Sequence, residues 1–353
     1  MKTLAAACMA TIIAGFAMSA SAFGDNRDPP PPPTDWKSQE LRDHPLVGKA
    51  WSTRDKAFVP LRDFGRSLAL ARFVLLGEVH DNADHHRWQA WAIRTISKLR
   101  GSRIVEGAPQ VDIIAMEMVR ADQNDALDKF YGRNVAVPRN RKPRDFARML
   151  KWSESGWPDF EIYAPIIEQA LYEQIVIVPA SVSRDFTRQV SKEGGASLAE
   201  GEPERLALAE PFDEARAQAM ASEIRDAHCG LMPDAAIPSM SFVQRFRDAI
   251  MADSLLSVAA GKGGILIAGN GHVRRDRGVP WYLEKRGVPA SAIVALELAE
   301  VSSEASDPEK YVERGPDGTP NADFMVFTPR ATREDPCTRM REQMQKKQTQ
   351  DRS

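Results

Sequence analysis

The apolar positions of this chain fall into short continuous runs separated by segments with helical spacing. Six such runs recur, at residues 73–76, 112–116, 175–178, 265–268, 292–296 and 324–327. Continuous rather than alternating apolar residues are typical of strands covered on both faces of a sheet. Strands separated by helices favour parallel βαβ crossovers. The pattern therefore predicts an α/β fold with a mainly parallel central sheet flanked by helices.

Helical patterns are clearest in four segments, residues 88–99, 210–228, 242–260 and 280–286. In the first, Trp88, Trp91, Ala92, Ile96 and Leu99 follow the spacing of one helix face. From about 121 to 251 helical signals dominate, and only 175–179 resembles a strand. We expect helical insertions there that form a cap subdomain over one end of the sheet.

The two ends of the chain differ from this pattern. Residues 1–22 combine a basic start, a short apolar run and Ala20-Ser21-Ala22, which together predict a cleaved signal peptide. Residues 23–45 contain five consecutive prolines and predict a stiff, extended linker. The folded domain is then expected at 46–330. Residues 331–353 are highly charged, and we expect a disordered tail.

Composition and charge limit which cellular compartment and which classes of binding partner we expect. The 353 residues include 47 Lys plus Arg and 49 Asp plus Glu, so no basic field favours nucleic acid. No segment after the leader approaches the roughly 20 apolar residues of a membrane span. We therefore expect a periplasmic or secreted protein without a transmembrane segment in the mature chain. Its two remaining cysteines, Cys229 and Cys337, either form a disulfide or stay free, and spacing does not decide between these.

Two predicted strands end in the same motif. Residues 73–76 are followed by Gly77-Glu78-Val79-His80, and residues 265–268 by Gly269-Asn270-Gly271-His272. In open α/β sheets, ligands bind beyond the carboxyl ends of the strands. If the two strands are near neighbours, Glu78, His80 and His272 converge at one edge. Two imidazoles and a carboxylate suit a divalent metal such as Mn, Co or Zn, and they also suit metal-free acid/base chemistry.

Other polar residues near these motifs are further candidates. Glu117 ends the second predicted strand, where it either joins the edge or pairs with Arg120. His85 shares a helix face with Trp88, whereas His86 lies about 100° away and is expected to be solvated. Arg274 could hold an anionic group. Asp84 is expected to cap the helix that follows. A second group lies on one helix turn and is expected to form a solvated face: Gln244, Arg247 and Asp248.

With these motifs the chain resembles the ChaN-like family of haem-binding uptake proteins in the Tiki superfamily. The matching stretches are residues 75–86, 115–118, 157–163, 228–230, 244–251, 267–274, 278–282 and 323–329. The resemblance implies a parallel α/β core with a helical subdomain. It also implies haem binding at a homodimer interface, in iron acquisition. No lipobox cysteine follows the leader, so the lipid attachment of some relatives is not expected.

The resemblance further implies that a tyrosine holds the haem. We assign Tyr163, which lies in a matching stretch, with Tyr131 and Tyr282 as rivals. His85, Glu117 and Arg274 are the other expected haem-binding residues.

Three functional hypotheses follow, of which the third is a scaffold with a vestigial site that binds neither haem nor a metal. The first is an exported haem-binding protein of haem or iron acquisition or trafficking. The second is a metal-dependent hydrolase, peptidase-like or esterase-like, because relatives in the superfamily use residues that match Glu78, His80 and His272. The sequence leaves open whether the protein is an enzyme.

Overall fold

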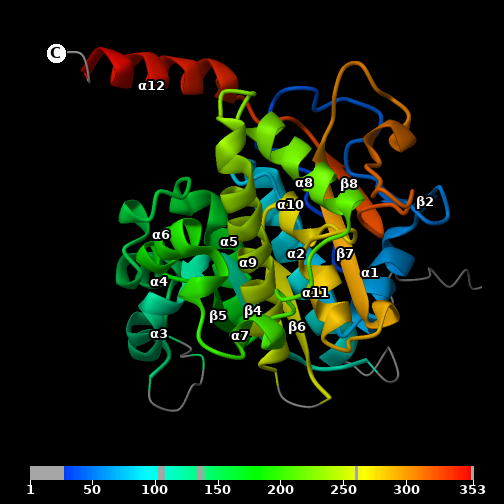
Figure 1. The fold of residues 1–353 in the computed structure, drawn as a ribbon. Coiled ribbons are helices and arrows are strands. Elements are labelled where there is room, and N and C mark those ends of the chain that lie inside the picture. Colours follow the sequence, from blue (N-terminus) through cyan, green and yellow to red (C-terminus); the bar gives the residue numbers. More distant parts are fainter. Residues whose placement is uncertain (1–27, 102–107, 133–136, 138–139, 259–260, 351–353) are drawn as a thin grey trace, which may run out of the picture.

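The computed structural model describes residues 28–101, 108–132, 137, 140–258 and 261–350, and within them a single sheet has eight strands (Figure 1). The order across the sheet is β2-β1-β8-β7-β3-β6-β4-β5. The strands are β1 Ala50–Ser52, β2 Ala57–Val59, β3 Phe73–Leu76, β4 Val111–Arg120, β5 Val176–Ser181, β6 Gly263–Ile267, β7 Ile293–Glu300 and β8 Phe324–Thr328. The predicted signal peptide, residues 1–22, lies outside the described residues.

The predicted parallel core is confirmed. Strands β8, β7, β3, β6, β4 and β5 pair in parallel, and each overlaps one of the six apolar runs. Successive side chains of one run point to opposite faces of the sheet. In β3, Val74 and Leu76 belong to one hydrophobic cluster, whereas Phe73 and Leu75 belong to the other. Burial on both faces explains why these strands show no alternation of apolar and polar residues.

Helices cover both faces of the sheet. They are α1 Leu61–Leu70, α2 Ala83–Gly101, α3 Asn124–Tyr131, α4 Pro143–Met149, α5 Phe160–Tyr172, α6 Arg184–Glu193, α7 Glu202–Arg205, α8 Glu214–Ala227, α9 Ile237–Leu256, α10 Asn270–Val273, α11 Val279–Lys285 and α12 Pro336–Gln350. Residues of α1 to α5 join the core on one face, and residues of α6, α9 and α11 join it on the other. The helical segment 121–251 is therefore divided between both faces, with α8 near the carboxyl ends of the strands (Figure 1). No helix of the described residues is both long and apolar enough to cross a membrane.

The segment expected to be a linker packs on the domain from Asp28 onward. Pro30 is buried, and its carbonyl oxygen accepts the indole N–H of Trp91 at 2.8 Å. Asp84 does not cap α2, because its carboxylate accepts the backbone N–H groups of residues 37 and 38 at 2.9 and 2.8 Å. Asn82 takes the capping place, since its side-chain oxygen accepts the Asp84 N–H at 2.9 Å. The prolines and Asp84 together fix this segment against α2.

The edges of the sheet and the C-terminal tail differ from the sequence prediction. An antiparallel β1–β2 hairpin, which the apolar pattern did not predict, extends the sheet beyond β8. At the opposite edge lies β5, which contains Pro179. The tail, expected to be disordered, forms α12, which projects from the body of the protein (Figure 1).

Candidate functional site

Two strand ends meet at one edge of the sheet. β3 and β6 are neighbouring parallel strands with Leu76 opposite Ile267, so the turns that follow them leave the sheet side by side. The first turn carries Glu78 and His80, and the second enters α10, which carries His272. The structure thus brings together the three residues that the two motifs placed at a common edge.

Glu117 links the two imidazoles. It lies near the end of β4, which pairs with β6, and its side chain is buried. One carboxylate oxygen, Oε1, is 3.4 Å from His272 Nε2, and the other, Oε2, is 3.9 Å from His80 Nε2. Oε2 also accepts the backbone N–H of Gly269 at 2.9 Å. Of the two alternatives for Glu117, the structure favours the edge, because Arg120 pairs with another carboxylate.

Glu78 orients the accessible histidine. Its Oε1 is 2.8 Å from His80 Nδ1, and the Tyr163 hydroxyl donates to the same oxygen at 3.0 Å. Glu78 and Tyr163 are buried, whereas the His80 side chain is 36% exposed. The edge of His80 contacts the ring of Trp157 at 4.9 Å between centroids. His80 is therefore the member of the cluster that a molecule in solution reaches most easily.

His86 also belongs to the cluster, and our expectation of a solvated side chain was wrong. It is fully buried, and its ring stacks on Tyr163 with centroids 3.9 Å apart. Its Nδ1 lies 3.1 Å from the Ile162 carbonyl oxygen, and its Nε2 lies 3.4 Å from Glu78 Oε2. The reason is that α5 packs against α2 and covers that side of the helix.

The polar turn of α9 is directed into the same cluster rather than into solvent. Asp248 is 1% exposed and lies 2.6 Å from His272 Nδ1. Gln244 Nε2 is 3.1 Å from the same nitrogen, and Arg247 forms an ion pair with Glu117. Three polar residues on one turn of a helix were the signal that sequence reasoning misread.

The carboxylates of the cluster are ionised at neutral pH. Burial alone would raise the pKa of Glu78, but the neighbouring His86 and His80 outweigh it and hold that pKa below its usual range. Burial acts in the same way on Glu117, where His272 and Arg247 hold the pKa well below the usual range. Burial raises the pKa of Asp248 to about 6, against the opposing effect of His272.

The neighbouring carboxylates raise the pKa values of His272 and His80. Burial would lower the pKa of His272, but Glu117 and Asp248 raise it to about 9, so this imidazole is a cation at neutral pH. The pKa of His80 is raised as well, because the hydrogen bond to Glu78 and the charge of Glu117 outweigh burial. The cluster is thus a set of alternating buried charges that compensate one another.

His85 lies outside this cluster, contrary to our expectation of a haem-binding residue. Its Nδ1 accepts the Val79 backbone N–H at 2.8 Å, and its Nε2 is 2.8 Å from Thr328 Oγ1. Burial and the neighbouring His86 lower the pKa of His85 to about 3, so the ring is neutral and Nε2 donates to Thr328. Both ring nitrogens of His85 form hydrogen bonds within the protein.

Tyr163 and Arg274 are also placed differently from our expectation. The Tyr163 hydroxyl is buried against Glu78, and burial together with that carboxylate raises its pKa. Arg274 pairs with Asp276, at 3.2 Å, and with Glu313. It lines a cavity of about 660 Å³ whose lining does not include Glu78, His80 or His272. Both side chains have partners within the protein, Tyr163 with Glu78 and Arg274 with two carboxylates.

The arrangement gives no support to a bound metal. Among the residues that the structure describes, no group of three or more His, Cys, Asp or Glu is arranged to hold a metal ion. Both ring nitrogens of His272 face carboxylates of the protein, those of Glu117 and Asp248.

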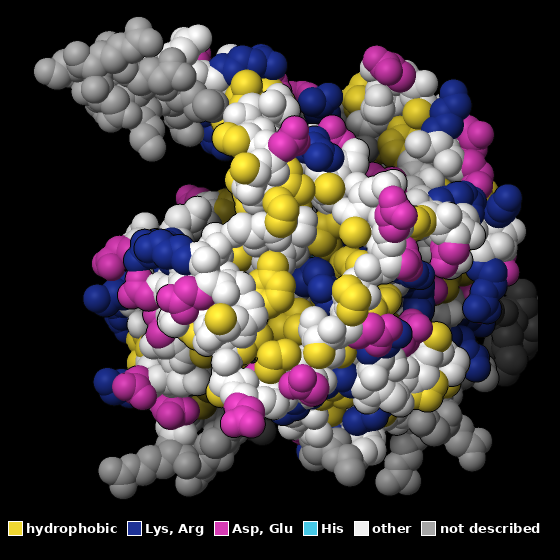
Figure 2. Space-filling model, viewed as in Figure 1, with side chains coloured by type: hydrophobic (Ala, Val, Ile, Leu, Met, Phe, Trp, Pro, Cys, Tyr) yellow, Lys and Arg dark blue, Asp and Glu magenta, His cyan; other side chains and the backbone are white. Residues whose placement is uncertain are grey.

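An apolar recess of about 570 Å³ adjoins the cluster. Its lining comes from α6, α8 and α9 and includes Met220, Ile224 and Val243. Gln244 and Arg247, which contact His272 and Glu117, form part of the same lining. Figure 2 shows hydrophobic side chains gathered on this face of the molecule, with basic side chains among them.

Comparison with solved structures shows the fold. The chain is similar to the ChaN protein of Campylobacter jejuni, described as binding haem cofacially, with 20% identity and a TM-score of 0.59. The match covers 78% of this chain and 95% of that one. A weaker similarity is to an erythromycin esterase in its open conformation, at 13% identity and a TM-score of 0.37, covering 82% of this chain and 99% of that one.

Sequence comparison shows the family. No curated protein matches the chain. The family model described as haem-binding uptake, Tiki superfamily, ChaN, matches residues 65–283. This range covers more than half of the 353 residues and includes the carboxylate–imidazole cluster. The chain therefore belongs to the ChaN family of haem-binding uptake proteins in the Tiki superfamily.

Proposed function

We propose that this protein is an exported haem-binding protein of haem or iron acquisition, and that it holds haem through Tyr172. Membership of the ChaN family supports the ligand. The Cys229–Cys337 disulfide supports export, because disulfides persist in oxidising compartments such as the periplasm. Removal of residues 1–22 and a haem-bridged homodimer are parts of the same proposal.

The choice of Tyr172 follows from the hydroxyl groups of the five tyrosines, all of which lie in the described residues. Three hydroxyls take part in hydrogen bonds with backbone groups or with Arg245, those of Tyr131, Tyr282 and Tyr311. The fourth, on Tyr163, is bonded to Glu78. Tyr172 has no hydrogen-bond partner in the described structure and is 77% exposed. It is the tyrosine whose oxygen is free to bind iron.

The surroundings of Tyr172 also suit haem. The residue lies at the end of α5, beside an open pocket of about 500 Å³. Arg141 and Lys142 line this pocket, together with the apolar surfaces of Pro143 and Leu171. A haem site needs an axial ligand, apolar contact and cations near the propionates, and these residues supply all three kinds of group. When bound, haem would supply the iron–porphyrin that is the cargo of uptake.

Tyr172→Phe is expected to weaken haem binding by at least about tenfold, a loss typical of altered metal coordination. Titration with haemin, followed by the Soret band, measures this. Tyr163→Phe and Tyr311→Phe should bind like the unaltered protein, and light scattering of the loaded protein reports whether a homodimer forms. An unaltered protein that gives no spectral shift would refute haem binding. A loss confined to Tyr163→Phe would return the axial ligand to that residue.

We propose acid/base hydrolysis without a metal as a second candidate function, on the strength of the Glu78–His80 pair. Glu78 holds His80 through Nδ1 and leaves Nε2 directed toward Glu117 on the accessible side. In its neutral form His80 would take a proton from water, and the resulting hydroxide would attack an ester carbonyl carbon. The protonated imidazole would then return the proton to the leaving alcohol. Arg247 and the His272 cation add positive charge near this point.

His80→Ala is expected to lower kcat/KM for a p-nitrophenyl ester by at least about 100-fold, the usual scale of general-base catalysis. His44→Ala, in a loop near the N-terminus, is the matched control and should leave the rate unchanged. The rate should rise with pH through the raised pKa of His80 and should be insensitive to EDTA. Loss with EDTA and recovery with Mn²⁺, Co²⁺ or Zn²⁺ would favour the metal-dependent form instead. Equal rates for His80→Ala and the unaltered protein would exclude His80 as the base.

A further inference from the structure

Helix α8 covers the carboxyl edge of the sheet next to the site. Glu223 and Ala227 of α8 line both the apolar recess and the 660 Å³ cavity beside Arg274, so the helix forms a wall shared by the two. A Cβ atom on Gly271 would lie 3.1 Å from Glu223 Oε1. Gly271 directly precedes His272. Movement of α8 would therefore open both cavities and uncover the turn that carries His272.

Helix α8 is attached to the rest of the protein by packing against α9 and by a few ion pairs, which include Arg225–Asp234 and Arg216–Asp317. Of its residues, Met220 and Ile224 are buried. Its polar attachments include an ion pair between Glu223 and Arg277 and a hydrogen bond from Arg216 to a backbone carbonyl. The Glu223 side chain is 42% exposed and that of Arg277 is 4% exposed, so solvent screens this ion pair only in part. A helix held by so few buried contacts opens locally at low cost.

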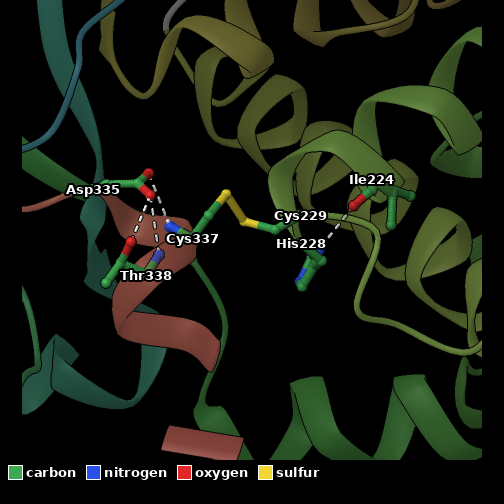
Figure 3. Close-up of a disulfide and its surroundings, with 6 residues drawn as sticks. All are labelled: Ile224, His228, Cys229, Asp335, Cys337 and Thr338. Atoms are coloured by element: carbon green, nitrogen blue, oxygen red, sulfur yellow. Dashed lines mark hydrogen bonds between the residues drawn. A yellow bond between two sulfur atoms is a disulfide. The ribbon is translucent and has the colours of Figure 1, made fainter. Parts of the chain in front are cut away.

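A covalent attachment supplements these contacts (Figure 3). Cys229, just after the end of α8, forms a disulfide with Cys337, which is 108 residues further along the chain. Asp335 fixes the partner end, because its carboxylate accepts the backbone N–H groups of Cys337 and Thr338 at 3.2 and 3.1 Å. The sequence left the pairing of these cysteines open, and the structure joins them.

The C-terminal strap, residues 331–337, connects this disulfide to the rim of the site. Arg333 donates to both carboxylate oxygens of Asp81, at 2.8 and 2.7 Å, and to those of Glu300, at 2.7 and 2.6 Å. Asp81 directly follows His80. The strap thus runs from the turn that carries His80 to the end of α8, which it holds by one covalent bond.

We propose that the Cys229–Cys337 disulfide is a redox switch that holds α8 closed over the site. A dithiol, whether a small molecule or a thiol–disulfide oxidoreductase, would reduce the bond by exchange. One thiolate of the dithiol attacks a sulfur of the disulfide, which releases one cysteine and forms a mixed disulfide with the other. The second thiolate of the dithiol then attacks this mixed disulfide and releases the second cysteine. Cys229 and Cys337 are each left as a thiol, the dithiol becomes a disulfide, and two electrons and two protons are transferred. Both cysteines are partly exposed, so a reductant reaches them.

The reduced state releases α8 without unfolding the core. Helix α9 buries seven residues and α11 buries four, so they keep their contacts when the disulfide opens. The effect is expected to be local to α8 and the strap. This inference does not depend on which ligand the site takes.

Hydrogen exchange of the full chain, with and without dithiothreitol, tests the switch. Reduction is expected to speed exchange of the α8 amides, residues 214–227, by at least about tenfold, with α9 and α11 unchanged. The Cys229→Ser/Cys337→Ser double variant should show fast α8 exchange with or without dithiothreitol. If that variant does not fold, reduced and alkylated unaltered protein serves in its place.

Two results would overturn the switch. Equal exchange of α8 in the oxidised and reduced protein would show that the disulfide does not hold the helix. An equal increase in α8, α9 and α11 would show general destabilisation rather than local release.

Discussion

Glu117→Gln is expected to lower the free energy of unfolding by about 3 kcal/mol at pH 7, because removing one member of a buried ion pair leaves its partners uncompensated. Glu117 is 2% exposed and faces Arg247 and the His272 cation. Glutamine keeps the shape and an oxygen for the Gly269 N–H, so the change removes mainly the charge. Urea unfolding at pH 7 measures the difference.

A double-mutant cycle separates charge compensation from packing. Arg247→Met alone should destabilise the protein, because it leaves the Glu117 carboxylate without its arginine partner. The double variant should lose less free energy of unfolding than the sum of the two single losses. Glu168→Gln on the exposed side of α5 is the control, with a change within about 0.5 kcal/mol. A Glu117→Gln variant as stable as the unaltered protein would contradict the compensated cluster. Simple addition of the two single losses would contradict the direct coupling of Glu117 to Arg247.

Stability is expected to fall between pH 6.5 and pH 9 because of His272. The pKa of this histidine is raised in the folded protein from its ordinary 6.5 to about 9. Its contribution is therefore fully present below pH 6.5 and is lost as pH rises through about 9. A rise of this size corresponds to about 3 kcal/mol. His80, whose pKa is also raised, acts in the same direction.

His272→Asn isolates this contribution, because asparagine keeps a donor for Asp248 but does not titrate. The difference in unfolding free energy between the two proteins should be largest near pH 6 and should decrease as pH rises through about 9. Asp248 does not obscure the result, since its pKa of about 6 lies at the lower end of the range. A difference that stays constant from pH 6 to pH 10 would mean that His272 is neutral in the folded protein.

The sheet could be predicted because each strand carries its own signal. A run such as 73–76 is apolar at every position because the strand is buried on both faces of the sheet. The neighbouring strand 263–267 lacks polar side chains for the same reason. The positions of Glu78, His80 and His272 follow from the same reasoning, since parallel strands present their carboxyl ends at one edge. The β1–β2 hairpin has only three residues in each strand, too few for a periodic pattern.

The rest of the site could not be predicted because it depends on packing between elements. A helical wheel places His86 away from the buried face of α2, but it contains no information on α5, which covers that side. From the sequence, Asp248 and Arg247 look like a solvated turn. In the fold they face His272 of α10 and Glu117 of β4, respectively. Tyr163 lies in a stretch that matches the family, but its hydroxyl donates a hydrogen bond to Glu78, which is 85 residues away in the sequence. Long-range hydrogen bonds of this kind leave no trace in local spacing.

The two edge strands limit how copies of this protein associate. β2 is three residues long, and β5 contains Pro179, which has no N–H for a further strand. Short strands and edge prolines discourage the edge-to-edge pairing of sheets that leads to fibrils. A homodimer of this chain would therefore be built through helical surfaces, such as the end of α5, and each copy would keep a separate sheet.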